Sequence, residues 1–69
     1  MTDIEVRLNG DPTVVESGTT LAQLVATLTA APRGVAVAVD ATVVPRGAWG
    51  LTVLDAGSHV EVLTAVQGG

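Results

Sequence analysis

Apolar and charged residues alternate over residues 3–8, which is the pattern of a half-buried β-strand. The apolar residues of this segment are Ile4, Val6 and Leu8. Asn9-Gly10 follows, and this dipeptide favours a type I′ turn because both residues accept positive φ. We expect Asp11 and Pro12 to extend the loop, because proline cannot donate to a central ladder. Thr13–Glu16 then returns as a short antiparallel edge strand, which makes the segment a β-hairpin.

A helical repeat follows the hairpin. Its apolar residues have the spacing i, i+3, i+4 and i+7, and they are Leu21, Leu24, Val25 and Leu28. Thr20 and Gln23 form a capping box at the start. Pro32 disfavours helical geometry at the residue before it, so we expect about eleven helical residues that end near Ala30-Ala31. The apolar stripe is suited to a core or to a partner protein, and in so short a chain we expect it to form the core.

The second half of the chain predicts three more strands. The first, Val35–Val39, alternates Val with Ala and is apolar on both faces. A tight turn at Asp40-Ala41 leads to the short strand Val43-Val44, which Pro45 ends. A loop with at most one turn of 3₁₀ helix is predicted for residues 46–50, and the last strand for residues 60–64.

The predicted order of elements is β-β-α-β-β-β, with the helix as the cover of one sheet face. The first and last strands can be long and central, and a right-handed crossover through the helix allows parallel pairing between elements before and after it. Val60 and Val62 are then expected to face the core, and Leu63 and Ala65 to face outward. Two apolar residues on an otherwise polar face predict a small docking surface for a partner protein.

Composition narrows the classes of function. The chain has 69 residues, no cysteine and a net charge of −4, with three arginines and no lysine. This length predicts a single small domain. The absence of cysteine excludes disulfides and thiolate chemistry. An acidic chain with one aromatic residue lacks the basic surface and the stacking platform that nucleic acids require. We see no leader peptide and no membrane span, and we expect a soluble cytoplasmic protein.

The sequence ends in Gly68-Gly69, which carries the most specific chemical signal. Glycine has no Cβ, so a terminal pair can enter a channel too narrow for other residues. A terminal carboxylate reacts as an acyl donor only after activation, usually by a nucleotide phosphate. A chain without lysine or cysteine offers such an activated group few nucleophiles of its own, although biased composition also explains the missing lysine. The alternative for the glycine pair itself is a frayed end or a cloning remnant.

Several segments together resemble the ThiS family, the sulfur carriers of thiamine biosynthesis. They are Asn9-Gly10, Thr20-Leu21 with Leu24, residues 36–39, residues 43–49, Gly57, residues 60–62 and residues 65–69. The chain departs from the family pattern at Asp40, Gly47 and Ser58-His59. The resemblance implies the α+β ubiquitin-like β-grasp fold, a mixed sheet of four to five strands with one main helix on one face. Residues 1–64 would form the domain and residues 65–69 a flexible tail.

The resemblance also implies a carrier that is not itself an enzyme and that binds no cofactor. A ThiF-like adenylating enzyme with ATP-Mg would activate the Gly69 carboxylate. A sulfur donor such as a cysteine desulfurase would then convert it to a thiocarboxylate for a ThiG-like thiazole synthase. Val66, Gln67 and Gly68 would thread into the active site of the adenylating enzyme, since five extended residues reach about 16–18 Å. Leu63, Ala65 and Arg46 are the candidates for partner docking.

Other interpretations remain open at this point. The tail chemistry also suits the small subunit of molybdopterin synthase, a sulfur carrier for cysteine synthesis or tRNA thiolation, a ubiquitin-like modifier, or an interaction domain with an inert tail. His59 stands alone, so a surface position is expected and a metal site is not. Trp49 is expected to cap the core instead of forming a ligand platform. Arg46 either pairs with an acidic partner surface or stays solvated.

Overall fold

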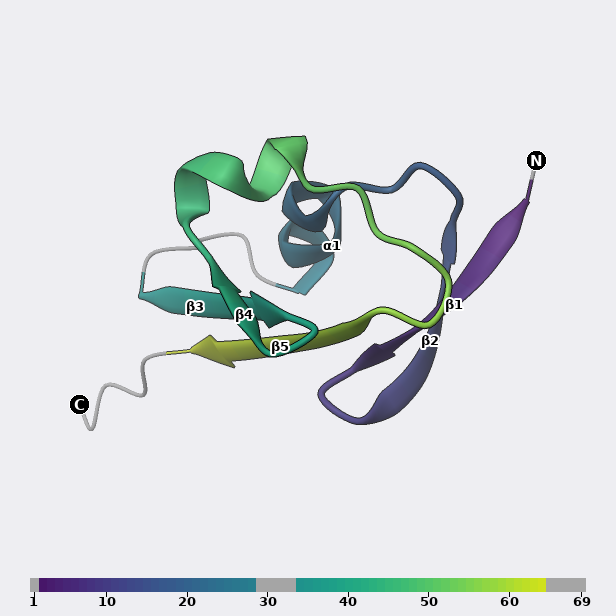
Figure 1. The fold of residues 1–69 in the computed structure, drawn as a ribbon, viewed down its shortest axis with the longest axis horizontal. Helices are drawn as coiled ribbons and strands as arrows, with labels where there is room; N and C mark the ends of the chain where they lie inside the picture. The colour runs from purple at the N-terminus through teal and green to yellow at the C-terminus, as the bar shows by residue number, and fades with distance from the viewer. Residues whose placement is uncertain (1, 29–33, 65–69) are drawn as a thin grey trace.

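The computed structural model describes residues 2–28 and 34–64, in which five strands form one mixed sheet (Figure 1). The elements in chain order are β1 (Asp3–Leu8), β2 (Asp11–Glu16), α1 (Leu21–Leu28), β3 (Val35–Val39), β4 (Thr42–Val44), the 3₁₀ helix η1 (Arg46–Leu51) and β5 (His59–Thr64). The strand order is β2-β1-β5-β3-β4. Helix α1 and η1 lie on the same side of the sheet. The first and last strands are central, as predicted, and they are neighbours.

The β1–β2 hairpin is confirmed, but its loop is shorter than expected. Asn9 and Gly10 alone form the turn, with φ of 51° and 87°, and Leu8 pairs directly with Asp11. The prediction that Asp11 and Pro12 extend the loop is therefore wrong. Pro12 pairs with Arg7, whose N–H donates to Ser58 on the other side of β1 at 2.8 Å. This pair needs no hydrogen bond between β1 and β2, so an edge strand accommodates the proline.

Helix α1 begins with the predicted capping box. The Gln23 N–H donates to Thr20 Oγ1 at 3.2 Å, and the Thr20 N–H donates to Gln23 Oε1 at 2.9 Å. Leu21, Leu24 and Val25 are buried, whereas Leu28 is 47% exposed, so the last residue of the stripe lies at the margin of the core. The predicted helix end near Ala30-Ala31 lies outside the described residues.

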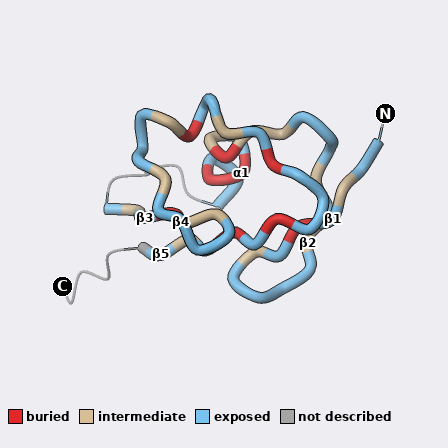
Figure 2. Tube along the Cα trace, in the orientation of Figure 1, coloured by how far each residue is buried: buried red, intermediate tan, exposed pale blue. Residues whose placement is uncertain are grey.

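The core lies between α1, η1 and the inner face of the sheet (Figure 2). Its buried members are Val6, Leu21, Leu24, Val25, Val37, Trp49, Leu54 and Val60. Trp49 is 4% exposed, and its indole N–H donates to the Val44 carbonyl at 2.9 Å. The expectation that Trp49 caps the core is confirmed. Its segment is a six-residue 3₁₀ helix that packs against α1 and is longer than the single turn predicted.

The second half of the sheet follows the predicted order with small shifts. The turn residues Asp40 and Ala41 have φ of 49° and 69°, and the strand after them begins at Thr42, one residue earlier than expected. The last strand begins at His59, also one residue earlier. Since β5 pairs in parallel with β1 and antiparallel with β3, it is flanked by a strand on each side. The strand that leads into the tail is thus the middle strand of the sheet.

Candidate functional site

The described structure fixes where the tail begins. Thr64, the last residue of β5, pairs with Val35 at the start of β3, so the chain leaves the sheet beside the first residue of that strand. In Figure 1 this end of β5 lies at the opposite end of the molecule from the start of β1. The predicted flexible tail falls outside the described residues; it comprises Ala65, Val66, Gln67, Gly68 and Gly69.

An apolar patch lies on the outer face of the sheet next to this point. Leu63 is 68% exposed and pairs with Ala36, while Val43 is 72% exposed and pairs with Ala38. We call these four residues the tail-side patch. The two short alanine side chains leave a shallow hollow between Leu63 and Val43, and Glu61 stands at its margin. Leu63 therefore does face outward on an exposed apolar surface, as the alternation in β5 predicted.

Three members of the tail-side patch were missed by sequence reasoning. The alternation of Val and Ala in residues 35–39 indicated a face where small residues allow close packing, but it did not say which side chains lie opposite. Only the strand register brings Ala36, Ala38 and Val43 together with Leu63. Cross-strand neighbours of this kind lie within about 4.5–5.5 Å at Cβ, so they form one surface.

Arg46, the third predicted docking residue, lies elsewhere. It is exposed at the start of η1, and the residues that line the hollow of the tail-side patch do not include it. The chain leaves β4 through Pro45 and turns toward α1, where η1 packs. Arg46 therefore belongs to the margin between the sheet and the helix layer and is a separate contact candidate.

Asn9 is a residue of this site that sequence reasoning assigned to the turn alone. Its side-chain Oδ1 accepts the Val62 N–H at 2.8 Å, and its Nδ2 donates to the Val62 carbonyl at 3.3 Å. The amide thus pairs with β5 as a strand residue would. No local signal predicts this contact, because its two partners are 53 residues apart.

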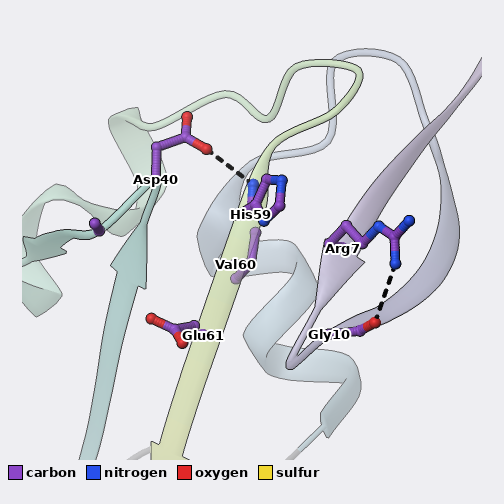
Figure 3. Close-up of a pocket in the computed structure, with 7 residues that line it drawn as sticks. Arg7, Gly10, Asp40, His59, Val60 and Glu61 are labelled. Carbon is purple, nitrogen blue, oxygen red and sulfur yellow. Dashed lines mark hydrogen bonds between the residues drawn. The ribbon is translucent and has the colours of Figure 1, made fainter.

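A second, charged hollow of about 430 Å³ lies at the start of β5, at the far end of that strand from the tail (Figure 3). Arg7, Asp40, His59 and Glu61 contribute to its lining. Two of these groups are engaged within the fold: Asp40 Oδ1 accepts the His59 N–H at 2.9 Å, and Arg7 donates to the Gly10 carbonyl at 3.3 Å. His59 is exposed, as expected. The hollow lies between the Asn9-Gly10 turn and the Asp40-Ala41 turn, on either side of β5.

Within the described residues, His, Asp and Glu side chains form no group of three or more that could hold a metal ion. None of the helices in residues 2–28 and 34–64 is long and apolar enough to cross a bilayer. The surface beside the start of the tail, with the strand that carries it, is therefore the candidate functional site.

Comparison with known proteins relates this chain to a family. A model of the ThiS family matches residues 5–69. The chain is 41% identical over 66 residues to a protein named thiazole synthase from Magnetococcus marinus, and the match covers 96% of this chain and 20% of that protein. The chain therefore spans about a fifth of the length of this relative.

The fold is similar to that of a solved ThiS structure. The crystal structure of thiamine biosynthesis protein ThiS from Geobacter metallireducens superposes with a TM-score of 0.80 at 28% identity. The match covers 96% of this chain and 100% of that one. The resemblance to ThiS and the expected ubiquitin-like β-grasp fold are both confirmed.

Proposed function

The chain belongs to the ThiS family, and from that premise we propose that it carries sulfur for thiamine biosynthesis as a thiocarboxylate on Gly69. One observation supports this most directly: the middle strand of the sheet runs out beside an exposed apolar patch. A partner that docks on the tail-side patch would meet the emerging tail at a fixed place. The body then provides recognition, and the glycine end provides the reacting carbon.

The proposed chemistry at Gly69 has three steps, which are adenylation, acyl transfer to sulfur and thiol–disulfide exchange. A carboxylate oxygen attacks the α-phosphorus of ATP, the bond to the β-phosphate breaks, and pyrophosphate leaves. A persulfide sulfur of the donor protein then attacks the acyl carbon, and AMP leaves with the electron pair of the broken C–O bond. The product is an acyl disulfide between Gly69 and the donor's cysteine. A second thiol attacks the cysteine sulfur of this acyl disulfide and forms a disulfide with it. The S–S bond breaks, and the thiocarboxylate stays on Gly69.

The acceptor that we propose is a thiazole synthase. The support is the relative of that name, in which a segment similar to this chain makes up about a fifth of the protein. A carrier and the enzyme that consumes its sulfur must meet at every turnover, which a shared chain would favour through a high effective concentration. We therefore propose that this chain delivers its sulfur to a thiazole synthase, after loading by a ThiF-like adenylating enzyme and a sulfur donor such as a cysteine desulfurase.

The central test is loading of the protein in vitro. The chain is incubated with a ThiF-family adenylating enzyme from the same genome, ATP-Mg, a cysteine desulfurase, cysteine and a thiol reductant, and its intact mass is measured. We expect a mass increase equal to the difference between sulfur and oxygen, located at Gly69 by fragmentation. An unchanged mass would overturn the proposal, and Gly69 joined to lysines of other proteins would identify a modifier instead.

A charged residue in the tail-side patch should impair loading. Leu63→Asp is expected to lower kcat/KM for adenylation by about tenfold or more, because apolar anchors at interface centres typically contribute ~2 kcal/mol or more. Leu63 is 68% exposed, so the thermal midpoint should change little. The rate is measured as pyrophosphate release at several carrier concentrations.

Leu51→Asp is the matched control for this variant. Leu51 is 84% exposed but lies on η1, in the helix layer on the other face of the sheet, so its adenylation rate should equal that of the wild type. Equal losses in both variants would show that added charge, and not the tail-side patch, is responsible.

A further inference from the structure

The side chain of Asn9 pairs with the strand that leads into the tail. Both polar atoms of its amide contact the backbone of Val62, at 2.8 Å to the N–H and 3.3 Å to the carbonyl. We propose that Asn9 is a positioning residue for the loading reaction, which fixes the direction in which the chain leaves the sheet. This inference rests on the proposed function, since it concerns how the tail reaches the adenylating enzyme.

The need for such a contact follows from the lengths of the central strands. β1 ends at Leu8, which pairs with Val60, whereas β5 continues along β3 as far as Thr64. After Leu8 the backbone of β1 turns away from β5 into the Asn9-Gly10 turn. The Asn9 amide occupies the place of the next strand residue, so Val62 has a neighbour on both sides, Val37 of β3 and Asn9 of the turn.

Without the amide, the last residues of β5 would be held on one side alone. A strand with one neighbour twists more freely than a strand with two. The start of the tail would then point in a wider range of directions while the tail-side patch stayed intact. Fewer docked complexes would have the tail in the active site, because positioning of a reacting group depends on fixed geometry at its base.

The chain contains a matched control at the other end of β5. Asp40, like Asn9, is the first residue of a two-residue turn with positive φ, and its Oδ1 accepts the His59 N–H at 2.9 Å. Asn9→Gly and Asp40→Gly therefore remove the same kind of contact from the same strand. Glycine accepts positive φ, so both changes preserve the turn. The two variants differ in where the contact is lost: Asn9→Gly loses it at Val62, near the tail, and Asp40→Gly loses it at His59, at the start of β5.

The experiment compares these two variants in the full chain. We measure kcat/KM for adenylation by pyrophosphate release, and the exchange rate of each β5 amide by NMR. Asn9→Gly is expected to lower kcat/KM by about 3- to 10-fold, the range for loss of one or two neutral hydrogen bonds. The Val62 amide should exchange faster in Asn9→Gly, and the His59 amide in Asp40→Gly. The adenylation rate of Asp40→Gly should stay within about twofold of the wild type.

The outcomes separate this inference from the proposed function. Equal kcat/KM for Asn9→Gly and Asp40→Gly, with the wild type adenylated, would overturn the positioning role alone. A wild-type chain that is not adenylated would overturn the proposed function and the inference with it. If Asn9→Gly folds poorly, Asn9→Asp takes its place in the comparison with Asp40→Gly. Asn9→Asp keeps an acceptor for the Val62 N–H but sets a carboxylate oxygen against the Val62 carbonyl, so its kcat/KM should fall below that of the wild type. A wild-type kcat/KM in Asn9→Asp would overturn the positioning role.

Discussion

Gly69→Ala is expected to lower the rate of thiocarboxylate formation by about 100-fold or more, because a small misplacement of a reacting group has effects of that size. A methyl group on the terminal residue would meet the walls of a channel shaped for glycine, and it would restrict the backbone angles that the acyl carbon needs for attack. The fold should be unaffected, because β5 ends at Thr64, before the substitution. The measurement is intact mass against time under single-turnover conditions, together with the thermal midpoint.

Gly50→Ala is the control for this prediction. A Cβ added at Gly50 meets nothing within 4 Å, and Gly50 lies in η1, away from the end of β5, so the same methyl group should change neither loading nor stability. If Gly69→Ala is loaded at the wild-type rate, then the idea of a narrow, glycine-selective channel is wrong.

Trp49→Ala is expected to reduce the free energy of unfolding by about 3–5 kcal/mol, as for other buried aromatic residues. The total stability of a 69-residue domain is roughly 3–10 kcal/mol, so this variant should be partly or fully unfolded near 37 °C. The indole is buried between η1 and the rest of the core, and its N–H holds the end of β4 through the Val44 carbonyl. Urea unfolding followed by circular dichroism measures the change.

Two variants show whether burial is the cause. Leu51→Ala lies in the same 3₁₀ helix but removes an exposed side chain, so the free energy of unfolding should change by less than about 0.5 kcal/mol. Trp49→Phe keeps most of the apolar area and loses the hydrogen bond, which should cost about 1–2 kcal/mol. A Trp49→Ala protein as stable as Leu51→Ala would contradict the assignment of Trp49 to the core.

Local chemistry explains which parts of the fold were predictable. Asn9-Gly10 and the pair Thr20 and Gln23 encode a turn and a helix start within a few residues, and both are present in the structure. The prediction for Pro12 was wrong, because proline is excluded from a central strand but not from an edge strand. At an edge it can occupy a position whose backbone nitrogen points away from the neighbouring strand. The length of η1 was also underestimated, since this segment packs against α1, which lies far from it in the sequence.

The candidate site was predictable only where it depends on strand alternation. Leu63 follows from the period of β5, whereas its neighbours Ala36, Ala38 and Val43 follow from register, which is set across the sheet. The contact of Asn9 with Val62 joins a turn to a strand near the other end of the chain, and such a pair has no signature in either segment alone. The roles assigned to residues 65–69 stay predictions, because these residues lie outside the described structure.

The central place of β5 also has a mechanical consequence. The start of β1 and the end of β5 lie at opposite ends of the molecule, and the two strands run parallel side by side. Tension applied along β5 at Thr64 would load its bonds to β1 and β3 together in shear, instead of peeling them apart one after another. Withdrawal of the tail from a partner's channel would therefore act in the direction in which the sheet resists force best. We expect the domain to stay folded through repeated cycles of insertion and release.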